Sequence, residues 1–393
     1  MTIRTAILVL TLAGAALWAQ PGRGPAVRSP EVSADGKVTF RLRAPDAKEV
    51  GVNGFGPRIP MQKDDQGIWS ATTDTLQPDL YTYSFTIDGA TVNDPANPLF
   101  KSSSGSAGQS MVRVPGAAPW NPGDGPKGAV THHFYHSALI GDDRDFYVYT
   151  PPNYDAHRKE PYPVLFLLHG LGDEASGWTT VGAANVILDN LIDSGKAKPM
   201  IMVNTLGYGT PDGPRGAMGA SMIPTFAKAL VEEVMPQVEK TYNAAKDRNH
   251  RAIAGLSMGG AESVYTGFHY LDKFAYIGSF SGAFVMWPRA NPAPPAAAGA
   301  APAGRGGGRG APRMEEADFA KNFPDLSAKV NNQVKLLWIA CGTDDGLNGV
   351  NNQFKAWLKA RDIKFTGLEI PGFAHVWPLW RRNLAELAPQ LFQ

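Results

Sequence analysis

Seven apolar runs of strand length recur between residues 131 and 393, and helix-like segments separate several of them. The runs are DFYVYTPP, YPVLFLLHG, PMIMVNTLGYG, HRAIAGLS, FAYIGSFSG, VKLLWIACGTDD and FTGLEIPG. Residues 223–242, IPTFAKALVEEVMPQVEKTY, have the apolar spacing of an amphipathic helix. Strands buried on both faces read as continuous apolar runs, so this alternation predicts an α/β fold in which helices cover both faces of a mainly parallel sheet.

Residues 30–116 follow a different pattern. The stretches KVTFRLRAP, EVGVNGFG, GIWSATT and LYTYSFTIDG alternate partly between apolar and polar residues, and turn sequences such as DDQG and IDG divide them. This pattern predicts a small all-β sandwich. Residues 117–130 are rich in Pro and Gly and are expected to be a linker. A chain of 393 residues is also too long for one ordinary core, so we expect two domains, with 131–393 as the second.

Two further segments are expected to lie outside these domains. Residues 1–19 contain Arg4, then an apolar stretch, then small residues that end at Ala19, which is the pattern of a secretory signal peptide. A membrane anchor is the alternative, but the apolar run is shorter than the roughly 20 residues that a bilayer span needs. We therefore expect a secreted protein, extracellular or periplasmic. Residues 291–313 are rich in Ala, Gly and Pro and are predicted to be a disordered low-complexity insertion.

The composition excludes several classes of function. The formal net charge of +1 gives no reason to expect a nucleic acid or an anionic membrane as partner. Cys341 is the single cysteine, so no internal disulfide can form. No His or Cys cluster has the spacing of metal ligands, and we expect neither a metal nor another cofactor. The oligomeric state stays open.

The stretch Gly255-Leu256-Ser257-Met258-Gly259 fits the motif G-x-S-x-G, between an apolar run and a helix-like segment. In such an elbow the turn is so sharp that a Cβ at either flanking glycine would collide, and the strained serine points its Oγ out of the sheet. The motif predicts that Ser257 is a nucleophile. The alternative is a small residue in a Gly-rich loop.

A serine hydroxyl needs a neighbouring base, and enzymes with this elbow place an acid and then a histidine later in the chain. ACGTDDG ends a strand at Asp344 and Asp345, and EIPGFAHVW follows a strand with His375. The spacing leaves the choice of aspartate open. His375 is predicted to be the base, because His169 belongs to the loop after YPVLFLLHG and the remaining histidines are expected in surface loops, in a helix or at the wrong strand end. That expectation places His132, His133 and His136 before the first strand of the domain.

An acyl-transfer reaction also needs N–H donors for the oxyanion. One is predicted to be the backbone N–H of Met258, at the positive end of the helix after the elbow. The other is expected in the loop after YPVLFLLHG, at Leu171, where Gly170 and Gly172 would let the backbone approach a substrate.

Several motifs together resemble a known family. DFYVYTPPNYD, VLFLLHGLGDEASGW, GLSMGG, KFAYIGSFSG and ACGTDDGL are similar, in this order, to the esterase D-like α/β-hydrolases of carbohydrate esterase family one, which include feruloyl and acetylxylan esterases. The resemblance implies an α/β-hydrolase fold for 131–393, favours Asp345 as the acid, and assigns Leu171 and Met258 to the oxyanion hole. Residues 30–116 resemble the immunoglobulin-like, isoamylase-type carbohydrate-binding-like modules that precede such esterases, with Trp69 at the position of a structural tryptophan.

The resulting hypothesis is a secreted serine carboxylesterase that acts through an acyl-enzyme on a small-molecule or polysaccharide-linked ester. A feruloyl ester of the plant cell wall is the first expectation. The alternatives are an acetylxylan esterase, an enterochelin-type esterase, an acyltransferase on the same scaffold, and a non-catalytic binding protein. Trp178 and Trp377 either form aromatic walls of the substrate site or pack the loops.

Overall fold

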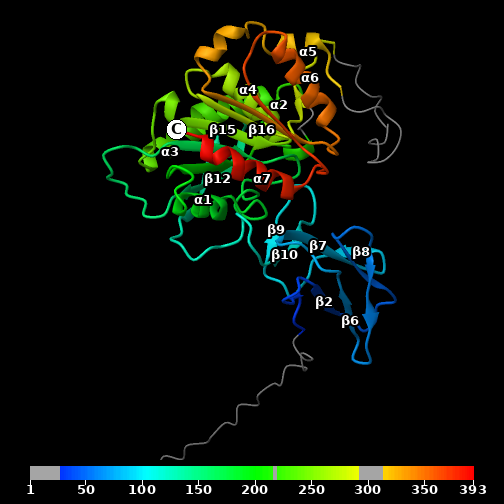
Figure 1. The fold of residues 1–393 in the computed structure, drawn as a ribbon. Coiled ribbons are helices and arrows are strands. Elements are labelled where there is room, and N and C mark those ends of the chain that lie inside the picture. The colour runs from blue at the N-terminus through cyan, green and yellow to red at the C-terminus, as the bar shows by residue number, and fades with distance from the viewer. Residues whose placement is uncertain (1–26, 216–218, 292–312) are drawn as a thin grey trace, which may run out of the picture.

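A computed structural model describes residues 27–215, 219–291 and 313–393, and Figure 1 traces the chain. The predicted signal peptide, 1–19, lies outside the described residues, as does most of the predicted insertion. No helix in the described ranges is both long enough and apolar enough to cross a membrane.

The larger domain is built on one eight-stranded sheet with the order β11-β12-β14-β13-β15-β16-β17-β18. The strands from β14 to β18 run parallel, and the hairpin β11–β12 joins them antiparallel at β14. All seven predicted strands are present, which confirms the α/β fold. The strands are β11 (Ala129–Ser137), β12 (Asp142–Thr150), β13 (Val164–Leu168), β14 (Ile201–Thr205), β15 (Arg251–Leu256), β16 (Tyr276–Phe280), β17 (Leu336–Gly342) and β18 (Thr366–Ile370).

Helices cover both faces of this sheet (Figure 1). The predicted helix at 223–242 is interrupted by a π-helical turn, Leu230–Val234, which separates α2 from α3. The α-helices are α1 (Ala184–Asp193), α2 (Met222–Ala229), α3 (Met235–Thr241), α4 (Met258–His269), α5 (Glu316–Asn322), α6 (Asn348–Lys359) and α7 (Trp377–Leu387). Short 3-10 helices lie at Gly213–Arg215, Arg248–His250, Phe284–Met286, Ala328–Asn332 and Ala388–Gln390.

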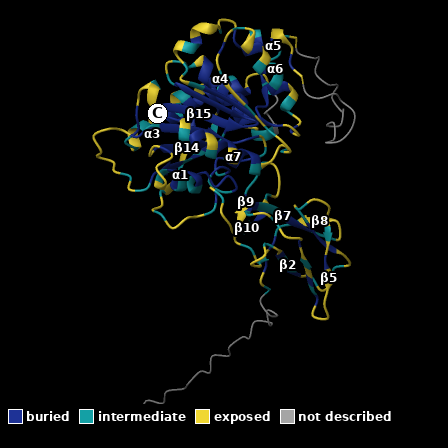
Figure 2. Ribbon diagram, viewed as in Figure 1, coloured by how far each residue is buried: buried dark blue, intermediate teal, exposed yellow. Residues whose placement is uncertain are grey.

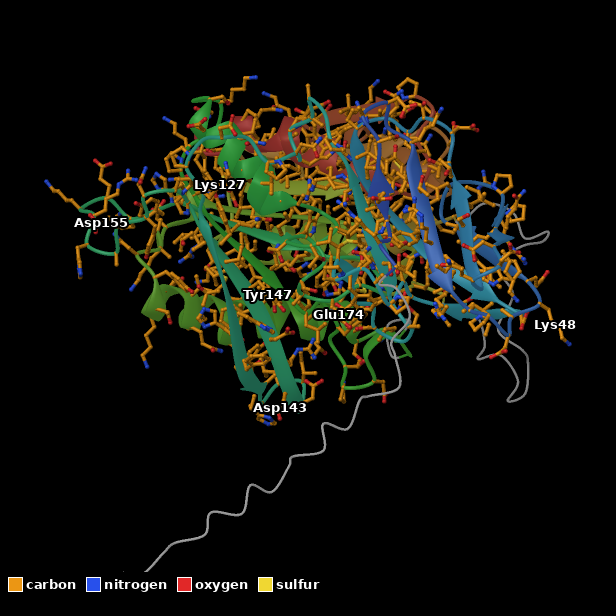
Figure 3. All side chains as sticks on the ribbon, turned by 90° about the horizontal axis from the view of Figure 1, so that it is seen from below. Lys48, Lys127, Asp143, Tyr147, Asp155 and Glu174 are labelled. Carbon is orange, nitrogen blue, oxygen red and sulfur yellow. The ribbon has the colours of Figure 1, made fainter. Side chains whose placement is uncertain are left out.

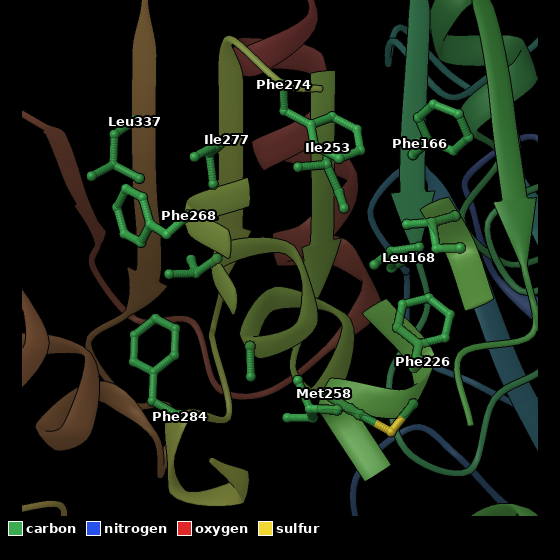
Figure 4. Close-up of a cluster of buried hydrophobic side chains, with 14 of the residues drawn as sticks. Phe166, Leu168, Phe226, Ile253, Met258, Phe268, Phe274, Ile277, Phe284 and Leu337 are labelled. Carbon is green, nitrogen blue, oxygen red and sulfur yellow. The ribbon is translucent and has the colours of Figure 1, made fainter. Parts of the chain in front are cut away.

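The side chains of β13 show how the sheet separates two cores. Phe166 and Leu168 face one apolar cluster, with α2 and α4, whereas Leu165 and Leu167 face the other, with α1 and α7. The central strands β13 to β17 are buried on both faces (Figure 2), and Figure 4 shows part of the first cluster, which includes Met258. This two-sided burial is the reason why these strands read as continuous apolar runs.

The N-terminal module consists of antiparallel strands that share one apolar core, as the sandwich prediction requires. Trp69 is buried in this core and its Nε1 donates to the carbonyl of Ala44 at 2.9 Å, so it packs the module. One sheet contains β1 (Glu31–Val32), β2 (Val38–Arg43), β6 (Ile68–Thr72) and β5 (Gln62–Lys63). The other contains β4 (Ile59–Pro60), β3 (Val50–Asn53), β7 (Asp79–Ile87), β10 (Gln109–Val114) and β9 (Phe100–Lys101), with β8 (Ala90–Val92) beside β7.

One sequence-based expectation is wrong near the start of the larger domain. His132, His133 and His136 do not precede its first strand, because they lie on β11, which pairs with β12 along nine residues. Alternation between exposed and half-buried residues hides this edge strand from a search for apolar runs. Figure 3 shows Asp143 at the end of this hairpin.

The segment predicted to be a linker is packed against the larger domain. Trp120 is only 4% exposed and lies in the apolar cluster that contains α1 and α7. The Nδ2 of Asn190, on α1, donates to the carbonyls of Pro119 and Asn121, at 2.8 Å each. The Pro and Gly content therefore marks an irregular segment here, but not a free one.

Candidate active site

Ser257 stands between β15 and α4 in a strained turn, with φ 54° and ψ −114°. A Cβ built on Gly255 would approach the carbonyl carbon and oxygen of Gly259 to 2.5 Å, and one on Gly259 would come within 2.5 Å of the His169 carbonyl oxygen. Such distances exclude a larger residue at either position. The turn is therefore the elbow that the motif predicts, with the strain held by its surroundings.

The imidazole of His375 bridges the other two predicted residues. Its Nε2 lies 3.0 Å from Ser257 Oγ, and its Nδ1 lies 2.8 Å from Asp345 Oδ2. Because an ionised carboxylate can only accept, Nδ1 carries the proton and Nε2 is left to accept from the serine hydroxyl. The three side chains come from the ends of three different strands, β15, β17 and β18. This arrangement can move a proton off the serine as it attacks a carbonyl.

The structure separates the two aspartates that the spacing left open. The side chain of Asp345 is fully buried, and its Oδ1 accepts the N–H of Leu347 at 2.8 Å. Burial raises the pKa of Asp345, but hydrogen bonds from His375, Leu347 and Ser281 and the charge of His375 outweigh it, so the pKa is lower than usual. Asp344 is exposed, and within the described ranges its carboxylate accepts only from the hydroxyl of Thr343.

The loop after β13 runs alongside the elbow. A Cβ on Gly170 would lie 3.2 Å from the Cβ of Ser257 and 2.6 Å from the Cδ1 of Leu256, so a larger residue here would crowd the elbow. Gly172 has φ +86°, a conformation that favours glycine. No hydrogen bond within the described parts of the chain uses the N–H of Leu171 or of Met258. Both groups can therefore donate to a bound oxyanion.

Two residues that the sequence did not single out as functional hold this loop. The Oη of Tyr208, after β14, accepts the N–H of Gly172 at 2.8 Å and donates to the carbonyl of Asp173 at 3.0 Å. His169 is buried, which lowers its pKa and keeps the ring neutral. Its Nδ1 donates to the Gly170 carbonyl at 2.8 Å, and its Nε2 accepts the N–H of Gly207 at 2.9 Å. The sequence GYG at the end of a predicted strand is the only signal for Tyr208.

The two tryptophans have different positions. Trp178 is fully buried, and its Nε1 donates to the carbonyl of Leu168 at 2.9 Å, so the aromatic-wall hypothesis is wrong for this residue. Trp377 packs edge-on against it, with ring centroids 5.1 Å apart, and also lines a cleft of about 410 Å³ beside His375. Residues of the N-terminal module, among them Tyr81, Thr82 and Gln109, also line the cleft.

Within the described ranges, no three His, Cys, Asp or Glu side chains are grouped so that they could hold a metal ion. The candidate site therefore consists of Ser257, His375 and Asp345, the N–H groups of Leu171 and Met258, and the cleft. The sequence predicted all five of these residues, but not the loop contacts or the module's share of the cleft.

Comparison with known proteins places this chain among esterases. Residues 137–391 match the family described as "Putative esterase". The chain is 31% identical over 384 residues to an endo-1,4-beta-xylanase/feruloyl esterase of Xylanibacter ruminicola. The matched region covers 95% of this chain and 47% of that protein. The chain thus spans about half the length of this relative.

Solved structures share the fold at lower identity. A ferulic acid esterase of family CE1 from Anaeromyces mucronatus, in complex with ferulic acid, has a TM-score of 0.55 at 21% identity and covers 71% of this chain and 96% of that one. An enterochelin esterase from Shigella flexneri has a TM-score of 0.64 at 19% identity, with 97% and 98% covered. The family match spans almost the whole larger domain, and these structures share its architecture, so the chain belongs to this esterase family of α/β-hydrolases.

Proposed function

We propose that this protein is a serine carboxylic-ester hydrolase with Ser257 as nucleophile, His375 as base and Asp345 as the acid that orients the imidazole. The observation that carries the proposal is the pair of contacts at His375, 3.0 Å to Ser257 Oγ and 2.8 Å to Asp345 Oδ2. Residues 118 and 30 positions apart meet at one imidazole, which a purely structural serine would not require.

In the first step Ser257 Oγ attacks the ester carbonyl while His375 Nε2 takes its proton. The oxyanion that forms accepts hydrogen bonds from the N–H groups of Leu171 and Met258, each worth about 3 kcal/mol in the transition state. His375 then gives its proton to the departing alcohol as the C–O bond breaks. A water molecule, deprotonated by His375, hydrolyses the acyl-enzyme and releases the carboxylic acid and Ser257.

We propose a feruloyl ester of plant cell-wall polysaccharide as substrate, with acetylxylan second. The 31% identity to a xylanase/feruloyl esterase over 95% of the chain supports this choice. The solved structures, at 21% and 19% identity, support the fold but not a substrate. Trp377, beside His375, offers an aromatic surface to a planar acyl group.

The cleft is less suited to an anionic siderophore. Lys101 is the one cationic Lys or Arg among the described residues that line it, and its ammonium already pairs with Asp173. An enterochelin-type substrate would be expected to need unpaired cations at this place. Enterochelin hydrolysis is therefore the weaker hypothesis, although its esterase shares the two-domain architecture.

The test compares rates of hydrolysis of methyl ferulate, acetylated xylan and a cyclic catecholate triester by the wild-type protein and by Ser257→Ala. We expect the highest kcat/KM with methyl ferulate and a loss of about 10⁴- to 10⁶-fold in Ser257→Ala. Retained activity in a folded Ser257→Ala protein would contradict the serine mechanism. A preference for acetylated xylan or the triester would contradict only the choice of substrate.

We also propose that the protein is exported, since residues 1–19 have the pattern of a signal peptide. Expression with the leader in a Gram-negative host, followed by N-terminal sequencing, tests this. We expect a mature chain that begins at Gln20 outside the cytoplasm. An uncleaved chain that stays in the cytoplasm would contradict the proposal.

A further inference from the structure

The N-terminal module contacts the loop that carries Leu171. Lys101, on β9, pairs through its Nζ with Asp173 Oδ1, and the two side chains are only 9% and 10% exposed. Ser103, just after β9, donates its hydroxyl hydrogen to the carbonyl of Gly172 at 2.5 Å. Both contacts cross from one domain to the other, and both end within two residues of Leu171.

The direction of the Leu171 N–H depends on these contacts through the planarity of one peptide bond. In a trans peptide the N–H of Leu171 and the carbonyl of Gly170 point in opposite directions. That carbonyl accepts from the N–H of Asp173 at 3.1 Å and from His169 Nδ1 at 2.8 Å. Lys101 holds Asp173 through its side chain, and Asp173 donates its N–H to the Gly170 carbonyl. Because that carbonyl and the N–H of Leu171 share one peptide plane, Lys101 also influences the direction of the N–H of Leu171.

Gly172 is held from two sides. Its N–H donates to Tyr208 Oη, in the larger domain, at 2.8 Å, and its carbonyl accepts from Ser103 Oγ, in the module, at 2.5 Å. A glycine with φ +86° has little steric restraint of its own, so these two hydrogen bonds set its orientation. Without the module, one of the two restraints is lost.

The module is docked firmly enough to act as a support. Arg381, on α7, is fully buried, and it donates to Asp79 Oδ1 at 2.6 Å, to the Leu80 carbonyl at 3.1 Å and to the Val181 carbonyl at 2.6 Å. Leu80 and Met111 of the module pack with Val181 and are contacted by Trp377. Figure 1 shows β9 and β10 beside the larger domain.

We propose that the N-terminal module is a positioning element of the active site. Lys101 and Ser103 hold the loop from Gly170 to Asp173 so that the N–H of Leu171 faces the oxyanion. This inference rests on the proposed function, since it needs an oxyanion at Ser257. The module thus acts on transition-state stabilisation and not only on substrate capture.

The test measures kcat and KM for methyl ferulate in Lys101→Met and Ser103→Ala. We expect kcat to fall about 10- to 100-fold in Lys101→Met and less in Ser103→Ala, with KM changed less than about twofold, since a displaced donor weakens the transition state and not the ground state. Lys101→Arg keeps the cation and is expected to recover most of kcat. Lys48→Met, an exposed lysine of the same module that Figure 3 labels, is the matched control.

A second readout is the affinity for a boronic acid that forms a tetrahedral adduct with Ser257. We expect this affinity to fall in Lys101→Met in proportion to kcat/KM, because the adduct resembles the transition state. If Lys101→Met does not fold, Ser103→Ala carries the test. Folded Lys101→Met or Ser103→Ala with wild-type kcat and boronate affinity overturns the inference, while an inactive Ser257→Ala leaves the esterase proposal standing.

Discussion

The elbow at Ser257 and the loop from His169 to Asp173 lie side by side, but different contacts hold them. Backbone atoms fix the elbow, since Ser257 N–H donates to the Phe280 carbonyl at 2.8 Å and the Ser257 carbonyl accepts from Ala283 N–H at 2.8 Å. Side chains from two other segments hold the loop, Tyr208 after β14 and Lys101 with Ser103 at β9. The elbow is therefore fixed by backbone contacts with the neighbouring strand β16 and the residues just after it, whereas the loop depends on side chains from more distant parts of the chain.

The largest effects are expected when the residues that face Ser257 are replaced, since the elbow acts only together with them. His375→Ala is expected to lower kcat/KM for methyl ferulate about 10⁴- to 10⁶-fold, and Asp345→Asn about 10⁴-fold, because the imidazole loses the partner that sets its tautomer. Asp344→Asn is the matched control and is expected to keep wild-type activity, since its carboxylate is exposed. The opposite result, with Asp344 essential, would contradict the assignment of the acid.

The next test breaks the elbow itself. Gly259→Ala places a methyl group 2.5 Å from the His169 carbonyl oxygen, so we expect the free energy of unfolding to fall by about 2–4 kcal/mol and activity to be lost. Gly349→Ala, on α6, meets no atom within 4 Å and is expected to be neutral or slightly stabilising. Urea unfolding followed by fluorescence measures both. Equal stability of the two variants would refute the steric account.

A smaller effect is expected on the loop side. Tyr208→Phe removes the Oη that accepts from Gly172 N–H and donates to the Asp173 carbonyl. We expect kcat to fall about tenfold with little change in stability, because the loop stays in place but is less well oriented. Tyr147→Phe, on β12, is the control (Figure 3). If kcat is unchanged in Tyr208→Phe, the loop is oriented by backbone contacts and not by this side chain, as the elbow is.

The smallest expected effect concerns a carboxyl group on the elbow side. Glu262, on α4, is fully buried, and neither of its oxygens has a hydrogen-bond partner within the part of the chain that the structure describes. Burial raises the pKa of Glu262 well above its usual value. The unfolded chain therefore releases this proton first, near pH ~4.3, and the contribution of Glu262 to stability declines as the pH rises from there toward the folded-state pKa.

Glu262→Gln cannot ionise, so we expect its free energy of unfolding to decline less than that of the wild type as the pH rises above the unfolded-state pKa of a glutamate. Chemical unfolding at a series of pH values measures this slope. Glu386→Gln, on the exposed side of α7, is expected to leave the slope unchanged. An unaltered slope in Glu262→Gln would mean that the buried carboxyl has another partner.

The sequence alone determined the features that depend on a few neighbouring residues or on a regular period. The apolar runs predicted seven strands, and the pattern is clearest for β13 to β17, because strands with two covered faces need apolar residues throughout. Gly255 and Gly259 predicted the elbow because the turn leaves no space for a Cβ. Ser257, the aspartate pair and His375 could be picked out because each comes shortly after a predicted strand, in the chain order that enzymes with this elbow use.

Tertiary structure decided the features that depend on contacts between distant residues. The spacing could not distinguish Asp344 from Asp345, because both follow the same strand and only the turn selects the one that faces His375. Lys101 and Asp173 lie in different domains, and Arg381 meets Asp79 across 302 positions of the chain. No local period encodes such pairs, since they form only when the two domains pack against each other. The orientation of the Leu171 N–H is thus a product of the assembled molecule.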